Sequence, residues 1–173
     1  MSRTFAIDPG NTQSALCVID TATLKPGPFL KADNENIRQY IAGLSPKPGD
    51  TVAIEMLQSY GNLIGRDVLE TAVWVGRFYE QFLAYGITPV LITRMEEKMH
   101  ICHDSKAGDA NIRRALIDRF CTHDFKNGKG TNKNPDFFYG FKADVWQAYA
   151  VGLTFIETRL CDTEISHNVS LSS

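Results

Sequence analysis

Two short apolar segments of this sequence each end in an acidic residue. Residues 5–7 (Phe-Ala-Ile) lead into Asp8, and residues 52–54 (Val-Ala-Ile) lead into Glu55. Both segments are typical of β-strands, in which side chains alternate between the two faces. In each strand the acid therefore shares its face with the alanine two positions earlier. If the strands are neighbours in a sheet, both carboxylates meet at one edge.

A third acid, Asp144, opens a long apolar segment that predicts the last helix. Mg²⁺ prefers oxygen ligands, and a few carboxylates with substrate phosphate make a suitable site. Two such ions about 4 Å apart can stabilise the attacking water and the leaving 3′-oxygen of a phosphodiester. Taken singly, Asp8 could form a turn, Glu55 could be solvated and Asp144 could favour the helix dipole. Their joint placement favours metal-dependent phosphodiester hydrolysis, which needs no Ser, Cys or His nucleophile.

The elements that would position these acids predict an α/β domain. A hairpin and an edge strand come first, because Pro26 and Pro28 suit an edge better than a central position. The expected strands cover residues 3–8, 13–20, 24–30, 51–55 and 87–93, and the expected helices cover 34–44, 67–85, 96–102, 109–120 and 142–159. We therefore expect a mixed five-stranded sheet flanked by helices. One domain is expected over residues 1–162, with a disordered polar tail at 163–173.

The composition is that of an ordinary soluble globular protein, with 43% hydrophobic and 22% charged residues. No apolar run approaches the roughly 20 residues that span a bilayer, so no membrane association is expected. The N-terminus shows no basic segment followed by an apolar one, so no secretory signal is expected. Four cysteines without a CxxC pair favour reduced thiols and a cytoplasmic location.

Several potential zinc ligands lie close together in the second half of the chain: His100, Cys102, His103, Cys121 and His123. Their spacing matches no compact zinc module. Isolated Cys and His side chains on helix or strand faces are the simpler interpretation, and zinc binding stays open.

The charge of the chain is unevenly distributed. The net charge is −2, but residues 106–142 carry eight Lys or Arg against four Asp, so this segment is +4 and the remainder −6. A basic region on an acidic protein indicates a directed contact with an anion, and nucleic acid is the leading candidate. A solvated helix face followed by a loop would give the same composition.

Three motifs together resemble those of the RuvC-type Holliday junction resolvases. They are FAIDPG at residues 5–10, AIE at 53–55 and DVWQAYAV at 144–151. Stretches at residues 54–56, 59–61, 70–78 and 109–120 are similar to the phage-encoded branch of that family. The resembling stretches follow one another in order over roughly residues 3–158, which makes the resemblance far more specific than one acidic turn.

The resemblance implies an RNase H-like nuclease that cuts four-way DNA junctions with paired nicks in strands of like polarity. Asp8, Glu55 and Asp144 are then the catalytic metal ligands, and two Mg²⁺ or Mn²⁺ ions are expected per site. No nucleotide cofactor is implied. A homodimer is implied through the long helix, at Val73, Gly76 and Arg77. A phage-encoded protein would act in the cytoplasm of the host cell.

One position departs from the family pattern. Bacterial resolvases usually carry two acids one turn apart on the last helix, whereas here the second position is Gln147. Asp109 is a tentative further metal ligand, although it could equally cap its own helix, and Asp104 ranks lower. Gln147 could hold a metal-bound water or a phosphate from outside the metal's ligand shell.

A set of basic and aromatic residues is expected to contact DNA. Lys and Arg side chains would meet phosphates, a contact that weakens with salt. Tyr60 could stack on an opened base, worth about 1–3 kcal/mol, or pack on the long helix instead. The full set is Tyr60, Arg66, Lys106, Arg113, Arg114, Lys126, Lys129 and Lys133.

Three alternatives stay open. The first keeps the fold but has broader substrates, such as other branched DNA or RNA. The second is an actin-like or sugar-kinase ATPase, whose phosphate loop also reads Asp-x-Gly, but that architecture needs about twice this length. The third is a catalytically weak protein that only binds junctions, which Gln147 makes conceivable.

Overall fold

A computed structural model describes residues 2–58, 65–123 and 126–160 of the chain. The first half contains β1 (Arg3–Asp8), β2 (Gln13–Asp20), β3 (Pro26–Asp33), α1 (Asn34–Gly43), β4 (Thr51–Met56) and α2 (Arg66–Leu83). The second half contains β5 (Val90–Thr93), α3 (Arg94–Cys102), α4 (Asp109–Phe120), α5 (Val145–Phe155) and the π-helix η1 (Ile156–Leu160). The expected tail at 163–173 and Tyr60 lie outside the described residues. No described helix has both the length and the apolar composition to cross a membrane.

The strands form one five-stranded sheet in the order β3-β2-β1-β4-β5. β1 pairs with β2 and β2 with β3 in antiparallel fashion, whereas β1 pairs with β4 and β4 with β5 in parallel. This topology confirms the predicted mixed sheet with an antiparallel start. β1 lies at its centre, so Asp8 ends the middle strand, between β2 and β4.

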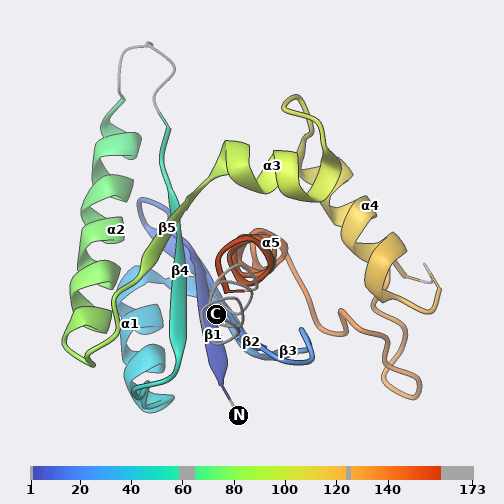
Figure 1. Ribbon diagram of the computed structural model, residues 1–173, viewed down its shortest axis with the longest axis horizontal. Coiled ribbons are helices and arrows are strands. Elements are labelled where there is room, and N and C mark those ends of the chain that lie inside the picture. The colour runs from blue at the N-terminus through green and yellow to red at the C-terminus, as the bar shows by residue number, and fades with distance from the viewer. Residues whose placement is uncertain (1, 59–64, 124–125, 161–173) are drawn as a thin grey trace, which may run out of the picture.

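Helices cover both faces of the sheet (Figure 1). α1 and α2 lie on one face, where they pack on Phe5 and Ile7 of β1 and on Val52 and Ile54 of β4. α5 lies on the other face against the small side chains Ala6 and Ala53 and their neighbours. The alternation read from the sequence therefore decides which helix each residue of β1 and β4 meets.

α5 approaches the sheet very closely because Gly152 has no side chain. A Cβ atom at this position would lie 2.6 Å from both the Cβ of Ala6 and the Cδ1 of Ile19. Real Cβ contacts are not that short, so the glycine and Ala6 together set the depth at which α5 packs. The depth of α5 in turn fixes the position of its first turn, where Asp144 lies.

Element boundaries differ from the predicted ones at several ends. β3 begins at Pro26 and continues to Asp33, because its pairing with β2 extends as far as Gln13. α2 ends at Leu83, and Gly86 follows with a φ of 75° that favours glycine. α5 begins only at Val145, after Ala143 has adopted a positive φ of 42°.

Residues 126–144, which lead to α5, form a succession of turns (Figure 1). Aromatic side chains anchor these turns. Phe137 stacks on Phe120 of α4 with ring centroids 4.8 Å apart. Phe138 packs against Trp146 and Tyr149 of α5 at 4.6 and 5.1 Å. The basic loop expected here is therefore tied at its far end to both helices.

Candidate active site

Asp8 and Glu55 lie next to each other at one end of the sheet. The parallel register pairs Ile7 with Ile54, so the following residues of β1 and β4 are the two acids. Burial raises the pKa of Asp8 well above its usual value, and the Glu55 charge raises it further. Burial also raises the pKa of Glu55, although nearby Arg94 opposes the rise. The interaction between the two side chains raises the pKa of Asp8 and lowers that of Glu55, so the two carboxyl groups are electrostatically linked.

The turn that follows Asp8 is rigidly held. The backbone N–H of Gly10 donates to Ser14 Oγ at 3.2 Å, and Asn34 Nδ2 donates to the Gly10 carbonyl at 2.9 Å. A Cβ atom on Gly10 would lie 2.2 Å from the carbonyl oxygen of Gln13. The DPG motif therefore has a structural reason: it closes the hairpin tightly enough for Asn34 at the start of α1 to bind it.

Sequence reasoning missed Glu97, whose carboxyl group belongs to the same acidic cluster. It lies on α3 with a fully buried side chain, and its charge contributes to the raised pKa of Asp8. Burial raises the pKa of Glu97 itself to about 8, even though Arg94 lowers it. Arg94 Nη1 donates to both Glu97 oxygens at 2.6 and 2.7 Å.

A sequence signal for Glu97 did exist. Thr93 and Glu96 form a capping box, with the Glu96 backbone N–H donating to Thr93 Oγ1 and the Thr93 backbone N–H donating to Glu96. This Thr-x-x-Glu pattern marks the start of a helix immediately after β5. It places Arg94 and Glu97 one turn apart on α3, beside the strand that neighbours Glu55.

Asp109 borders the cluster: its charge adds to the burial that raises the pKa of Glu55 and of Glu97, and its side chain contacts Arg94. It is the first residue of α4, and Gly108 rather than Asp109 occupies the N-cap position. Its side chain is 65% exposed and forms an ion pair with Arg94. Asp104 lies in the preceding loop, where it accepts a hydrogen bond from the backbone N–H of Lys106 at 2.8 Å.

Asp144 occupies the N-cap position of α5 and pairs with Lys31 of β3. Its charge also contributes to the raised pKa of Asp8, so the three predicted acids interact electrostatically. One turn along α5, Gln147 Oε1 is buried and has no hydrogen-bond partner among the residues that the structure describes. Buried polar atoms are rarely left unpaired, so this oxygen points to a missing ligand, water or ion.

The donor set suits a hard divalent cation, since every acid in the cluster offers oxygen. Even so, among the described residues no three acidic, His or Cys side chains are arranged so that they could hold a metal ion. Asp8 and Glu55 form an adjacent pair, Lys31 holds Asp144, and Arg94 holds Glu97 and Asp109. Three of the acids, Asp144, Glu97 and Asp109, are thus paired with the protein's own cations, whereas Asp8 and Glu55 face each other.

The described residues expected to bind DNA are spread over α2, α4 and the loops before and after α4. Arg66 begins α2 at the end of the sheet where β4 ends (Figure 1), and it pairs with Glu70 at 2.5 Å. Arg113 lies over the Trp146 ring at 5.4 Å, which ties α4 to the first turn of α5. Arg114 pairs with Asp118 at 2.7 Å. Exposed positions are held by Lys106, Lys126 and Lys133, while Lys129 is half-buried.

Three of the five His and Cys side chains considered for zinc have other partners. His100 Nε2 lies 2.7 Å from Glu157, and His123 Nδ1 lies 3.1 Å from Asp136. Cys121 Sγ lies 3.4 Å from the Gly128 carbonyl oxygen. These side chains connect α3, α4 and the following turns.

No protein-family model matches the sequence, and no curated protein matches it either. Solved structures do match the fold. RuvC of T. thermophilus in complex with a Holliday junction substrate aligns over 92% of this chain and 96% of its own, with a TM-score of 0.64 and 12% identity. A second Thermus thermophilus RuvC structure gives a TM-score of 0.62 at 15% identity, over 91% and 96% of the two chains. Fowlpox virus resolvase with Holliday junction DNA gives 0.54 at 14% identity, over 90% and 99%. The chain therefore has the RuvC-like, RNase H-like fold that its motifs predicted.

Proposed function

We propose that this protein is a divalent-metal-dependent endonuclease that resolves four-way DNA junctions by paired nicks. The observation that carries the proposal is the Asp8–Glu55 pair at the ends of β1 and β4. It is supported by the electrostatic contact with Asp144 and by the RuvC-like fold. The motifs favour the phage-encoded branch of the resolvases, and hence the cytoplasm of a host cell.

Asp8, Glu55 and Asp144 would hold Mg²⁺ or Mn²⁺, with two ions expected. The metal would activate a water molecule and stabilise the leaving 3′-oxygen. Gln147 Oε1 would complete the polar lining by accepting a hydrogen bond from a bound water. Burial raises the pKa of both Asp8 and Glu55, and the Glu55 charge raises that of Asp8 further; a divalent cation would stabilise the ionised form of both groups.

The basic region would hold the DNA backbone. Arg113 and Arg114 line a pocket on α4 together with Asn127 of the following loop. Lys106 lies before α4, and Lys126, Lys129 and Lys133 extend the surface along the loop. Contacts of this kind position the duplex arms without reading their sequence. Both a bacterial and a viral neighbour by fold carry Holliday junction DNA in their structures.

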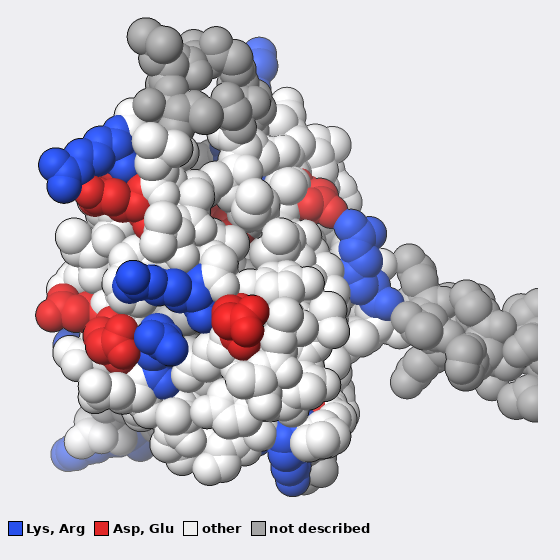
Figure 2. Space-filling view, turned by 90° about the vertical axis from the view of Figure 1, so that its left-hand side faces the viewer, with Lys and Arg blue, Asp and Glu red and all other residues white. Residues whose placement is uncertain are grey.

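Paired nicks require two active sites, and α2 offers the surface for a second copy of the chain. Leu69 and Val73 are 57% and 55% exposed one turn apart, and Gly76 continues the same face. Exposed apolar side chains of this size in a row are typical of an interface. Figure 2 shows this side of the molecule, where charged groups of both signs leave broad uncharged surface between them.

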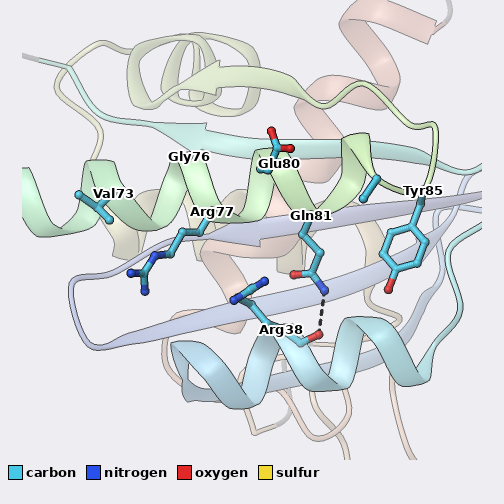
Figure 3. Close-up of a pocket in the computed structure, with 8 residues that line it drawn as sticks. Arg38, Val73, Gly76, Arg77, Glu80, Gln81 and Tyr85 are labelled. Atoms are coloured by element: carbon cyan, nitrogen blue, oxygen red, sulfur yellow. Dashed lines mark hydrogen bonds between the residues drawn. The ribbon is translucent and has the colours of Figure 1, made fainter.

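A groove between α1 and α2 runs beside this face (Figure 3). Gln81 Nε2 donates to the Arg38 carbonyl at 2.9 Å across the groove, while Arg77 and Tyr85 project from the α2 side. We propose that the α2 faces of two copies meet here, with Val73, Gly76 and Arg77 at the contact.

The decisive experiment is cleavage of a labelled four-way junction with and without Mg²⁺. The wild type is expected to cut the junction symmetrically only with metal. Glu55→Gln is expected to abolish cutting and retain binding, whereas the exposed control Glu35→Gln on α1 should cut normally. Equal cleavage of a linear duplex would contradict junction selectivity, and cleavage of flaps or RNA at equal rates would favour the broader nuclease.

A second candidate is a junction-binding protein with weak catalysis. It is favoured by Gln147 in place of an acid and by the lack of a ready three-acid group among the described residues. Tight junction binding by the wild type without any metal-dependent nick would support this candidate.

A further inference from the structure

We infer that Lys31 is an internal counter-ion of the active site, which holds Asp144 until a divalent cation takes its place. This inference rests on the proposed function, because it names the residue that controls how the metal site assembles. Lys31 was not among the residues expected to bind DNA or metal. The register of the sheet shows that Lys31 lies in the same row as the acidic pair.

The strand register places Lys31 in the same row as the acidic pair. β3 pairs Lys31 with Ala15, and β2 pairs Ala15 with Asp8. Continuing the row, β1 and β4 bring Asp8 beside Glu55. Residues in one row of a sheet point to the same face, and neighbouring strands are about 4.8 Å apart. Lys31 therefore lies on the α5 face, about 10 Å from Asp8 by that strand spacing.

Ala15, the residue of β2 between Lys31 and Asp8, does not block the lysine side chain. Ala15 is the only side chain of β2 in this row, and its methyl group is too small to block the long lysine. The ammonium group reaches across the sheet to the start of α5 and pairs with Asp144. The two side chains are 32% and 48% exposed, so water and ions can reach the pair.

This pairing explains why the acids form no ready metal site. Asp144 is close enough to raise the pKa of Asp8, yet among the described residues no three acids are grouped as metal ligands. To join Asp8 and Glu55 around a cation, Asp144 has to release Lys31. A partly exposed ion pair contributes little stability, whereas a divalent cation would be attracted by all three carboxylates.

The exchange predicts that removing the lysine charge strengthens metal binding. The test compares Mn²⁺ affinity, measured by calorimetric titration, in the wild type, Lys31→Met and Lys25→Met. Lys25 is an exposed lysine just before β3, so its variant makes the same charge change away from the site. Lys31→Met is expected to bind Mn²⁺ about fivefold more tightly, the range of one partly exposed ion pair. Lys25→Met should match the wild type.

A second readout follows the lysine itself. Amine-reactive labelling with mass spectrometry compares Lys31 and Lys25 in the same wild-type protein, with and without Mg²⁺. Release from Asp144 should raise the labelling of Lys31 several-fold, while Lys25 stays unchanged.

The inference requires both results. Unchanged or weaker Mn²⁺ binding by Lys31→Met, or unchanged labelling of Lys31, would overturn it while leaving the proposed metal site intact. Absence of Mn²⁺ binding by the wild type would instead contradict the metal site itself, and the inference with it.

Discussion

At the scale of single residues, the site is a set of carboxyl groups whose burial and closeness to one another disfavour their ionised forms. Burial is the main cause of the raised pKa of Asp8, and the negative charges of Glu55, Asp144 and Glu97 raise it further. Groups that must be ionised to bind metal are thus held in a place that opposes their ionisation. Such an arrangement does not stabilise the fold or the hairpin turn. It is explained by the binding of a cation, which would stabilise the ionised carboxylates.

The raised pKa values predict how stability depends on pH without metal. A carboxyl group whose folded pKa lies above its unfolded value keeps its full stability contribution below the unfolded pKa. Stability then falls as the pH rises toward the folded pKa. For Glu97 this window runs from the ordinary value of 4.5 to about 8, and Asp8 adds a loss in the same direction. With EDTA present, we expect the wild-type Tm to be lower at pH 8 than at pH 6.

Replacing Asp8 measures how much this residue contributes to the loss of stability at high pH. In EDTA at pH 8, Asp8→Asn is expected to raise the Tm by about 2–4 °C, the shift that 1 kcal/mol produces in a domain of this size. Mg²⁺ should then stabilise the variant less than the wild type. The exposed acid variant Asp118→Asn serves as a control in the same calorimetric scans. A Tm below that of the wild type would show that the Asp8 charge is not repelled.

At the scale of elements, Arg94 joins three parts of the fold. It follows β5, lies in the first turn of α3 and pairs with Glu97 in α3 and Asp109 in α4. Arg94→Met would leave the fully buried Glu97 carboxyl group without its partner, which typically costs about 1–3 kcal/mol. Urea unfolding measures this loss, which should grow between pH 6 and pH 9 as Glu97 is driven to ionise.

The matched control is Arg114→Met on α4. Its ion pair with Asp118 is more than half exposed on both sides, and exposed pairs contribute only about 0–1 kcal/mol. Equal losses in the two variants would mean that Arg94 is an ordinary surface residue.

The close contact between α5 and the sheet predicts that a larger side chain at Gly152 destabilises the protein. Gly152→Ala adds a Cβ atom 2.6 Å from Ala6 and Ile19 atoms, so α5 must move outward. Overpacking of this kind typically costs about 1–3 kcal/mol. The shift should also weaken Mn²⁺ binding, because α5 carries Asp144. Gly43→Ala in α1 is the control, since a Cβ there meets nothing within 4 Å. Wild-type stability for Gly152→Ala would contradict the close packing of α5.

The sequence predicts this framework because local patterns determine it. Alternation in β1 and β4 assigns Phe5 and Ala6 to opposite faces, and both assignments hold. Glu97 and Lys31 were not found because their importance depends on tertiary structure. Glu97 becomes buried only when α3 packs against α5 and α4, and Lys31 meets Asp144 across 113 positions of sequence. The sheet register that joins them is not visible in either local segment.

At the scale of the whole molecule, the candidate active site and the proposed dimer surface lie on different sides of the sheet. The acidic cluster lies at the end of the sheet on the α5 side, whereas the exposed apolar residues of α2 lie on the opposite face. A second copy could therefore bind α2 without covering the active site. Two sites held in one dimer are what paired nicks across a junction require.

The dimer proposal makes a sharp prediction at Val73. Val73→Glu places a charge at the centre of the exposed apolar face of α2, where burying it against a second copy is costly. We expect sedimentation equilibrium to show a dimer for the wild type and a monomer for this variant. Met99→Glu is the control, because Met99 is 45% exposed on α3 away from α2. On a junction held in a supercoiled plasmid, the Val73→Glu monomer should nick one strand and release the DNA before the second cut, so that single nicks replace resolved products. A monomeric wild type, or a Val73→Glu variant that remains dimeric, would move the interface away from α2.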